Sequence, residues 1–301
     1  PLGDSAVLAP LPGRLAFTTD SYVVRPLRFP GGDIGELAVN GTVNDLAVAG
    51  ARPLWLAAGF VLEEGLDEAT LRELVASMAG AARRAGVAIA AGDTKVVERG
   101  RADGMYVTTA GVGVLEHDLV LGPDRVRPGD RVLLSGTLAD HGMAVLIARG
   151  DLQLSGDVRS DTAPLAELVA TLLPLGDRLR WMRDPTRGGL ATALNELAAQ
   201  SCLAVRLRED ALPVAPAVAA ACEILGIDPL YVANEGKLVA VVAEEAAPDA
   251  LAALRGHPLG SHAVEIGVVE PEPEGLVLLD TALGGSRIVD LLLGDPLPRI
   301  C

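Results

Sequence analysis

The sequence predicts an α+β protein of two domains with a mobile C-terminal tail. Strand-like and helix-like patterns are mixed along its 301 residues, without the strict strand–helix alternation of a doubly wound sheet. The stretch DRVRPGD (124–130), rich in Pro, Gly and charge, interrupts these patterns and indicates a domain boundary. We therefore predict domains at 1–126 and 127–293 and a tail at 294–301, where Pro296 and Pro298 exclude a helix.

The first domain is predicted to combine β-rich runs with two helices, one of them long and amphipathic. The predicted strands are 15–24, 55–62, 87–97 and 105–115, and the predicted helices are 32–50 and 67–86.

The second domain is predicted to repeat this mixture. Its segment 161–173 contains Pro164 at a position that suits the start of a helix. The other predicted helices are 139–150 and 188–200, and the predicted strands are 131–136, 237–243 and 263–269.

The composition excludes several classes of partner. With 25 basic and 40 acidic side chains the net charge is -15, which disfavours nucleic acid or an anionic membrane as a partner. A polyanionic ligand would need metal ions or backbone amides to hold it. No apolar run reaches the roughly 20 residues of a membrane span, and no leader sequence is recognisable, so we expect a soluble cytoplasmic protein.

The three cysteines form no CxxC pair. Cys202 and Cys222 lie in apolar, helix-like contexts, which predicts that both are small buried residues. Cys301 is different, because it follows the proline-containing segment DPLPRI at the last position of the sequence. It is either an incidental cysteine at a frayed end or a reactive thiol on a tether.

Five aspartates lie in short, sharply bounded motifs at predicted strand ends and helix starts. Carboxylates are the ligands that Mg²⁺ prefers, and a nucleotide held through such ions would suit an acidic protein. Each aspartate taken alone is better explained as a helix cap or turn residue, but five of them in such positions make that explanation less attractive. They are Asp4 in GDSAVL, Asp20 in TTDSY, Asp45 in NGTVNDLAVAG, Asp93 in AGDTK and Asp184 in RDPTRGGL.

Other motifs add candidate polar contacts. RDPTRGGL places Arg187 and two glycines before a helix, either to bind phosphate through backbone amides or to make a tight turn. Glu235 in NEGK and Lys95 in GDTK are candidates for a general base or a phosphate contact, unless they are solvated. His141 opens a predicted helix as a cap or an active-site contact. The sequence has no GxxxxGK[ST] loop, no GxGxxG after a first strand and no zinc motif.

Together these motifs strongly resemble the HypE family of hydrogenase maturation factors, over nearly the whole chain. More distantly they are similar to the ATP-binding superfamily of aminoimidazole ribonucleotide synthetase. The resemblance rests on residues 18–65, AGDTKVVERG, ADHG, RDPTRGGLATALNE, NEGK and the final PRIC.

The resemblance implies a two-domain aminoimidazole ribonucleotide synthetase-like fold, with the N-terminal sheets of a homodimer joined in a shared barrel. The N-terminal domain would bind ATP and dimerise, with ATP and Mg²⁺ near the partner chain. The residues that match metal- and nucleotide-binding positions are Asp4, Asp20, Asn44, Asp45, Gly92, Asp93, Thr94 and Asp184, of which Asp4, Asp45, Asp93 and Asp184 would be metal ligands.

The activity implied by the resemblance is ATP-dependent dehydration of a carboxamide on the Cys301 thiol, which the partner HypF attaches. The nitrile product would supply cyanide ligands for nickel–iron hydrogenase through the HypC–HypD complex. Glu235 is the expected base with His141 second, and Lys95 or Arg187 would stabilise charge. An eight-residue tail reaches up to ~26 Å, so we expect inserted and withdrawn positions linked to nucleotide binding.

Two other functions stay open from the residues alone. One is an ordinary small-molecule enzyme of the same superfamily that phosphorylates an amide oxygen or selenide, and the other is a non-catalytic maturation scaffold. The family also carries a glycine-rich segment ahead of GDSAVL that is not in this sequence, which predicts weaker ATP binding or an incomplete lid.

Overall fold

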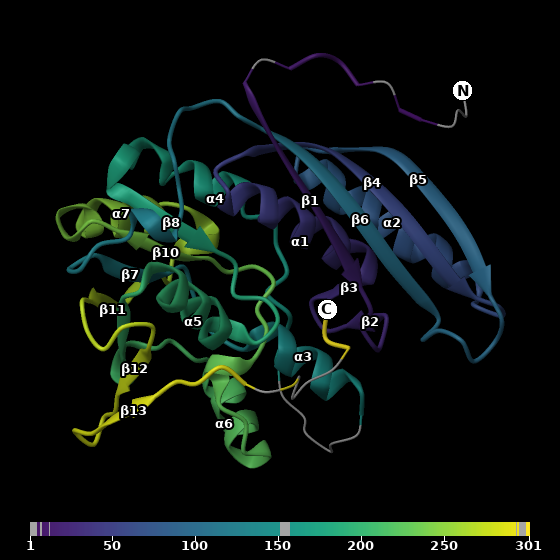
Figure 1. The fold of residues 1–301 in the computed structure, drawn as a ribbon. Coiled ribbons are helices and arrows are strands. Elements are labelled where there is room, and N and C mark those ends of the chain that lie inside the picture. Colours follow the sequence, from purple (N-terminus) through teal and green to yellow (C-terminus); the bar gives the residue numbers. More distant parts are fainter. Residues whose placement is uncertain (1–4, 7, 12, 151–156, 293, 295–298) are drawn as a thin grey trace.

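A computed structural model describes residues 5–6, 8–11, 13–150, 157–292, 294 and 299–301. Two α+β units lie side by side, with an N-terminal sheet and its helices next to a larger C-terminal unit (Figure 1). Asp4, Pro296 and Pro298 are outside the described residues. In the described part of the chain, none of the helices combines the length and apolarity that crossing a bilayer would require.

The N-terminal sheet has four strands in the order β1-β6-β4-β5. β6 pairs antiparallel with β1 and β4, whereas β4 and β5 are parallel. Helices α1 and α2 pack against this unit, and α1 starts where the Asp33 side chain accepts hydrogen bonds from the Gly35 and Glu36 amides. The bounds are β1 Arg14–Tyr22, β4 Arg52–Glu63, β5 Ala88–Val97, β6 Met105–Leu115, α1 Ile34–Val48 and α2 Glu68–Arg84, with the short pair β2 Arg28–Phe29 and β3 Gly32–Asp33.

The C-terminal sheet has seven strands in the order β13-β12-β9-β11-β7-β10-β8. All of its pairs are antiparallel except β9 with β12, so the fold is α+β and not doubly wound, as the sequence predicts. The strands are β7 Arg131–Leu134, β8 Leu179–Arg183, β9 Ala204–Arg208, β10 Val239–Val242, β11 Val264–Glu270, β12 Val277–Asp280 and β13 Ser286–Ile288. The helices are α3 Asp140–Ala148, α4 Ala166–Ala170, α5 Gly189–Ser201, α6 Pro216–Leu225 and α7 Ala247–Arg255.

Helix α1 joins the two units. Its Asn40 side chain donates to Thr162 Oγ1 at 3.1 Å, and its Ala47 and Val48 belong to a hydrophobic cluster otherwise made mainly by the C-terminal domain. Thirteen of its 15 residues are buried, because it has partners on both sides. One side of α1, with Asn40, Ala47 and Val48, therefore faces the junction between the domains, while the other packs in the N-terminal core.

The structure corrects the prediction for one cysteine and confirms it for another. Cys202 is exposed, because it ends α5 with φ +57°, a left-handed conformation that turns the chain away from the helix. Cys222 is buried in α6, and burial raises the pKa of its thiol to about 11. Helical spacing alone therefore did not distinguish a helix end from a helix interior.

Candidate active site

The end of the chain lies against the N-terminal domain, beside β2 and β3 (Figure 1). The Val23 amide donates to the carbonyl of Cys301 at 3.1 Å, and the Arg25 amide donates to the carbonyl of Arg299 at 3.1 Å. Ile300 is 4% exposed and packs in a core cluster of the C-terminal domain. In this structure residues 299–301, the described end of the tail, are therefore docked in contact with both domains.

His141, at the start of α3, holds the docked tail. Its Nε2 lies 2.8 Å from the carbonyl oxygen of Ile300, and its Nδ1 lies 2.8 Å from Ser160 Oγ. A carbonyl can only accept, so Nε2 carries the proton and Nδ1 accepts from the Ser160 hydroxyl. Complete burial lowers the pKa of His141, which keeps the ring neutral. His141 thus contacts the residue before the thiol.

An ion pair and a guanidinium group add to this docking. Arg299, which has φ +60°, places Nη1 3.1 Å from Asp103 Oδ1 in the loop between β5 and β6. Arg149 Nη2 donates to the Arg299 carbonyl at 2.8 Å, and its Nε donates to the Arg25 carbonyl at 2.9 Å. The left-handed backbone at a non-glycine residue is unfavourable, so these contacts must stabilise it.

The Cys301 thiol lies between groups of opposite charge. Arg187 Nη2 donates to Sγ at 3.6 Å, while the charges of Glu235 and Asp20 disfavour a thiolate. Burial, followed by Glu235, raises the pKa of the thiol to about 12 despite Arg187. The docked sulfur is therefore protonated at neutral pH, a state that suits a group carrier better than an attacking nucleophile.

Glu235 is held in a loop that leaves its carboxyl group buried. Asn44 on α1 donates to the Glu235 carbonyl at 3.1 Å, and Asp161 accepts from the amides of Glu235 at 3.2 Å and Gly236 at 3.0 Å. Lys237 Nζ, 3.2 Å from Asp161, balances that carboxylate. At Gly236 a Cβ atom would lie 1.7 Å from the Asp161 carbonyl oxygen, so only glycine fits.

The Glu235 side chain is 2% exposed, and its Oε1 has no hydrogen-bond partner among the described residues. Burial raises the pKa of Glu235 well above its usual range, and the charges of Asp184, Asp161, Asp20 and Asp45 raise it further. A carboxylate in such surroundings is a stronger base than that of an ordinary glutamate.

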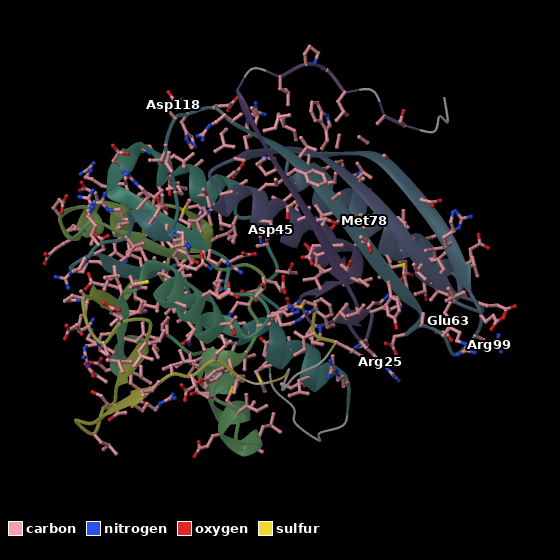
Figure 2. All side chains as sticks on the ribbon, viewed as in Figure 1. Arg25, Asp45, Glu63, Met78, Arg99 and Asp118 are labelled. Carbon is pink, nitrogen blue, oxygen red and sulfur yellow. The ribbon has the colours of Figure 1, made fainter. Side chains whose placement is uncertain are left out.

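Asp20, Asp45 and Asp184 complete this acidic cluster from three different elements. Thr18 Oγ1 donates to Asp45 Oδ2 at 2.8 Å, and Asp45 lies at the junction of the two domains (Figure 2). Burial, followed by the charge of Asp45, raises the pKa of Asp184 to about 7. Burial raises the pKa of Asp45 as well, followed in the same direction by Asp20. These carboxylates repel one another across the junction, which favours a cation between them.

The loop that carries Asp184 and Arg187 is tied directly to the loop that carries Glu235. The Asn234 amide and side chain both donate to the Pro185 carbonyl, at 3.1 and 3.0 Å. Gly188 and Gly189 have φ of +74° and +62°, and a Cβ at Gly189 would lie 2.4 Å from the Leu230 carbonyl oxygen. The two glycines therefore allow the tight turn that brings Arg187 to the thiol.

A second group of predicted residues lies elsewhere, on edge strand β5. Gly92, Asp93, Thr94 and Lys95 are exposed, and Lys95 Nζ lies 2.8 Å from Asp93 Oδ2. Asp20 shares a cross-strand row with Thr109, Ala58 and Gly92, whereas Asp93 shares the adjacent row with Gly59, Thr108 and Ser21.

Adjacent rows point to opposite faces of a sheet, and strands β1 and β5 are three spacings apart, about 14 Å. One chain therefore does not bring Asp93 and Lys95 to the buried acidic cluster. Within the described residues no three Asp, Glu, His or Cys side chains are close enough to hold a metal ion by themselves. The nucleotide and metal roles of Asp93 stay predictions for an assembly of two chains.

Asn44 has a contact that the sequence did not indicate. Its side chain donates to the carbonyls of Ala163 and Glu235 and accepts from the Leu165 amide at 2.7 Å, so its amide group is occupied by the C-terminal domain. Sequence reasoning also missed Asp161 and Tyr22. Both side chains are buried beside predicted site residues. Tyr22 directly follows TTDS, which was the only signal for it, whereas nothing in the sequence links Asp161 to NEGK, 73 residues further along the chain.

Comparison with known families identifies both domains. The model of the AIR synthase related protein N-terminal domain matches residues 2–115, and that of the C-terminal domain matches residues 127–279. The chain is 57% identical over 290 residues to a carbamoyl dehydratase HypE of Bradyrhizobium diazoefficiens, covering 96% of this chain and 84% of the relative. It is 49% identical to the carbamoyl dehydratase HypE of Escherichia coli, covering 99% and 88%.

Solved structures give the same result. A hydrogenase maturation protein HypE in complex with ATP matches with a TM-score of 0.95 and 51% identity, covering 100% of this chain and 90% of that one. A HypE–HypF complex matches with a TM-score of 0.90 and 48% identity, covering 94% and 92%. A thiamine monophosphate kinase from Aquifex aeolicus, at 22% identity and a TM-score of 0.65, shares the fold alone, with coverage of 91% and 90%.

Proposed function

The chain belongs to the HypE family of carbamoyl dehydratases, and we propose that it dehydrates a carboxamide carried by its own Cys301 to the nitrile at the expense of ATP. The product, S-cyanocysteine, would supply cyanide ligands during maturation of a nickel–iron hydrogenase. The observation that carries this proposal is the docked tail, which places the Cys301 sulfur beside Arg187 and within reach of the charge of Glu235.

The ATP requirement is supported by the ATP complex of a HypE that is 51% identical to this chain. We place the triphosphate next to the carboxylates of Asp20, Asp45 and Asp184, whose mutual repulsion favours a counter-cation. Mg²⁺ fits this donor set, because it commonly binds one or two carboxylates together with substrate phosphates. When bound, it would neutralise charge on the phosphoryl group.

The oxygen of a carboxamide is a poor leaving group, so it must first be activated by ATP. The carboxamide oxygen attacks the γ-phosphorus of ATP, the bond to the bridging oxygen breaks, and ADP leaves. The nitrogen then gives up both protons as the carbon–oxygen bond breaks, which releases inorganic phosphate and leaves Cys–S–C≡N. Each turnover converts one carboxamide and one ATP into nitrile, ADP, phosphate and one net proton.

Two described residues have suitable positions for these steps. Glu235 would accept one of the two nitrogen protons, because neighbouring carboxylates make it a stronger base than an ordinary glutamate, and the departing phosphate would take the other. Arg187, which already donates to Sγ, would support the negative charge that develops near the carboxamide oxygen. His141 would fix the tail through the Ile300 carbonyl, and this leaves Glu235 as the preferred base.

The proposed partners follow from the tail and from the exposed strand. The complex of a HypE with HypF supports HypF as the donor of the carboxamide. We further propose a homodimer in which β5 of one chain delivers Gly92, Asp93, Thr94 and Lys95 to the site of the other, because all four are exposed in a single chain. HypC–HypD would accept the cyanide.

The test is a mass measurement on the protein. After incubation with HypF and its substrates, Cys301 should gain a carboxamide, and addition of ATP should remove one water from that adduct. The Cys301→Ala variant should show neither change, while Cys202→Ala, which alters an exposed cysteine at the end of α5, should show both. Retention of the carboxamide in the presence of ATP and Mg²⁺ would refute the proposal.

A further inference from the structure

Two buried polar atoms near Cys301 lack hydrogen-bond partners among the described residues: Tyr22 Oη and Glu235 Oε1. Tyr22 is 1% exposed and Glu235 is 2% exposed, so bulk water does not satisfy either atom. A buried polar group without a partner costs on the order of 1–3 kcal/mol. Thr42 and Asp20 are polar neighbours of the Tyr22 hydroxyl, but neither completes a hydrogen bond of good geometry.

Both atoms border the place where the tail ends. Tyr22 is the last residue of β1, and the next residue, Val23, donates to the Cys301 carbonyl. The Tyr22 ring points at α1, where a Cβ on Gly41 would lie 2.2 Å from Oη. Asn44, three residues further along the same helix, donates to the Glu235 carbonyl, so the hydroxyl and the Glu235 loop meet one face of α1.

The electrostatics agree with this placement. The charge of Glu235 acts on the Tyr22 hydroxyl and also on the Cys301 thiol, and Asp20 acts on both. The Tyr22 hydroxyl and the Cys301 thiol are therefore both electrostatic neighbours of Glu235. The Cys301 thiol does not satisfy the hydrogen-bonding capacity of Tyr22 Oη and Glu235 Oε1, because sulfur is a weak donor and a weak acceptor.

The unused groups are one hydroxyl donor and one carboxyl acceptor. A primary carboxamide presents the complementary pair, a carbonyl oxygen that accepts and an NH₂ group that donates. We propose that Tyr22 is a further catalytic residue, whose hydroxyl donates to the oxygen of the carboxamide on Cys301 while Glu235 Oε1 accepts from its nitrogen. This inference rests on the proposed function and deepens it.

These two hydrogen bonds would orient the carboxamide for the reaction. A carbonyl oxygen has two lone pairs, so one can bond to Tyr22 while the other faces the phosphorus of ATP. Holding the N–H bonds toward Glu235 places the leaving protons at the base before the oxygen is activated. An S-acetyl group, which has no N–H donor, would leave Oε1 unpaired and bind poorly. The nitrile also lacks donors, so the docked tail loses this stabilisation once the reaction is complete.

The test is the Tyr22→Phe variant, which keeps the ring against Gly41 and removes only the hydroxyl. Since that hydroxyl has no partner before the carboxamide is attached, the variant should unfold at no lower temperature than the wild type. It should still accept a carboxamide from HypF and bind ATP. Its single-turnover rate of nitrile formation, followed by intact mass, should fall on the order of 10²-fold. Tyr231→Phe is the matched control, because its hydroxyl donates to the Asp290 carbonyl on the C-terminal domain.

An infrared measurement tests the contact without relying on the rate. With a ¹³C-labelled carboxamide and a non-hydrolysable ATP analogue, the carbonyl stretch of the wild type should lie below that of a free peptide carrying the same group. In Tyr22→Phe it should move to higher frequency, and in Tyr231→Phe it should not move.

The outcomes separate this inference from the proposed function. Nitrile formation by Tyr22→Phe at the wild-type rate, with an unchanged carbonyl stretch, would overturn the role of Tyr22 and leave the dehydration intact. Failure of the wild-type chain to form any nitrile would overturn the proposed function, and the inference with it.

Discussion

The two faces of the N-terminal sheet carry acidic residues in opposite states. Asp45 lies on the covered side, at the domain junction, where burial raises its pKa and where Asp184 and Glu235 crowd it. Asp93 lies on the exposed edge strand, where the Lys95 side chain and the Thr94 amide lower its pKa. Similar short motifs therefore place Asp45 among buried carboxylates that lack a compensating positive charge. They place Asp93 in an exposed ion pair with Lys95, on a strand that a second chain can reach.

Asp45→Asn should have the largest effect on activity. Removing one carboxylate from the junction weakens the proposed Mg²⁺ site, and we expect nitrile formation to be abolished, with a loss of at least ~10³-fold. The fold should persist, because the loss of a buried negative charge relieves repulsion of Asp184. The measurement is single-turnover mass analysis, with Asp118→Asn, on the exposed linker, as the control (Figure 2). Normal turnover by Asp45→Asn would disprove the metal assignment.

Glu235→Gln should follow, with a fall of ~10²–10⁴-fold in the dehydration rate. The amide preserves the shape and the loop held by Asn44 and Asp161, but it cannot accept a proton. Calorimetry should show ATP binding close to that of the wild type. If the rate of the variant matches that of the wild type, the base is another group.

The pH dependence of stability should reveal the buried acids of the junction. Asp184 titrates with a pKa of about 7 in the folded protein, above its usual range, so the folded state holds its proton more tightly than the unfolded state does. Its contribution to stability is present below pH 4 and is lost as the pH rises to about 7, by up to about 4 kcal/mol.

Asp184→Asn should remove that loss, so its free energy of unfolding in urea should fall less than that of the wild type between pH 5 and pH 8. Parallel curves for the two proteins would show that Asp184 is not a buried carboxyl group crowded by other acids.

Much of the fold and several residues of the candidate site could be predicted from the sequence. Hydrophobic spacing placed β6 at 105–115 with the bounds that are observed, and the motifs NEGK and PRIC indicated Glu235 and Cys301. The spacing could not show which side of the sheet Asp93 faces, because that depends on the register of β4 with β5. It also could not reveal the short strand β8, whose LRWMR sequence contains two arginines and shows little alternation.

The position of the tail was beyond local reasoning for another reason. His141 and Ile300 are 159 residues apart, and their contact depends on the packing of α3 against β2 and on the end of β1. His141→Ala should lower the equilibrium constant for docking of residues 299–301 about 3- to 10-fold by removing one hydrogen bond worth roughly 1 kcal/mol. In a Cys202→Ala background, iodoacetamide should then alkylate the Cys301 thiol faster, as followed by intact mass, whereas an unchanged rate would argue against a role for this contact.

Lys95→Ala should have the smallest effect on the stability of the fold. It also tests whether the exposed residues of β5 take part in the reaction. Its side chain is exposed and its ion pair with Asp93 is on the surface, so the melting temperature should stay within experimental error. If β5 serves the second chain of a dimer, dehydration should nevertheless fall. Unchanged activity would show that the exposed group takes no part in the reaction.

The most direct test of the central claim is a mixing experiment that asks whether the acidic cluster acts on the tail of its own chain. The Glu235→Gln chain, carrying a carboxamide on Cys301, is mixed and re-equilibrated with Cys301→Ala chains that retain Glu235, and ATP is added. The docked contacts of Val23, His141 and Arg187 with the tail of the same chain predict that the carboxamide persists, as judged by intact mass. Loss of one water from that chain would show that the partner chain processes the tail, which would contradict catalysis within a single chain.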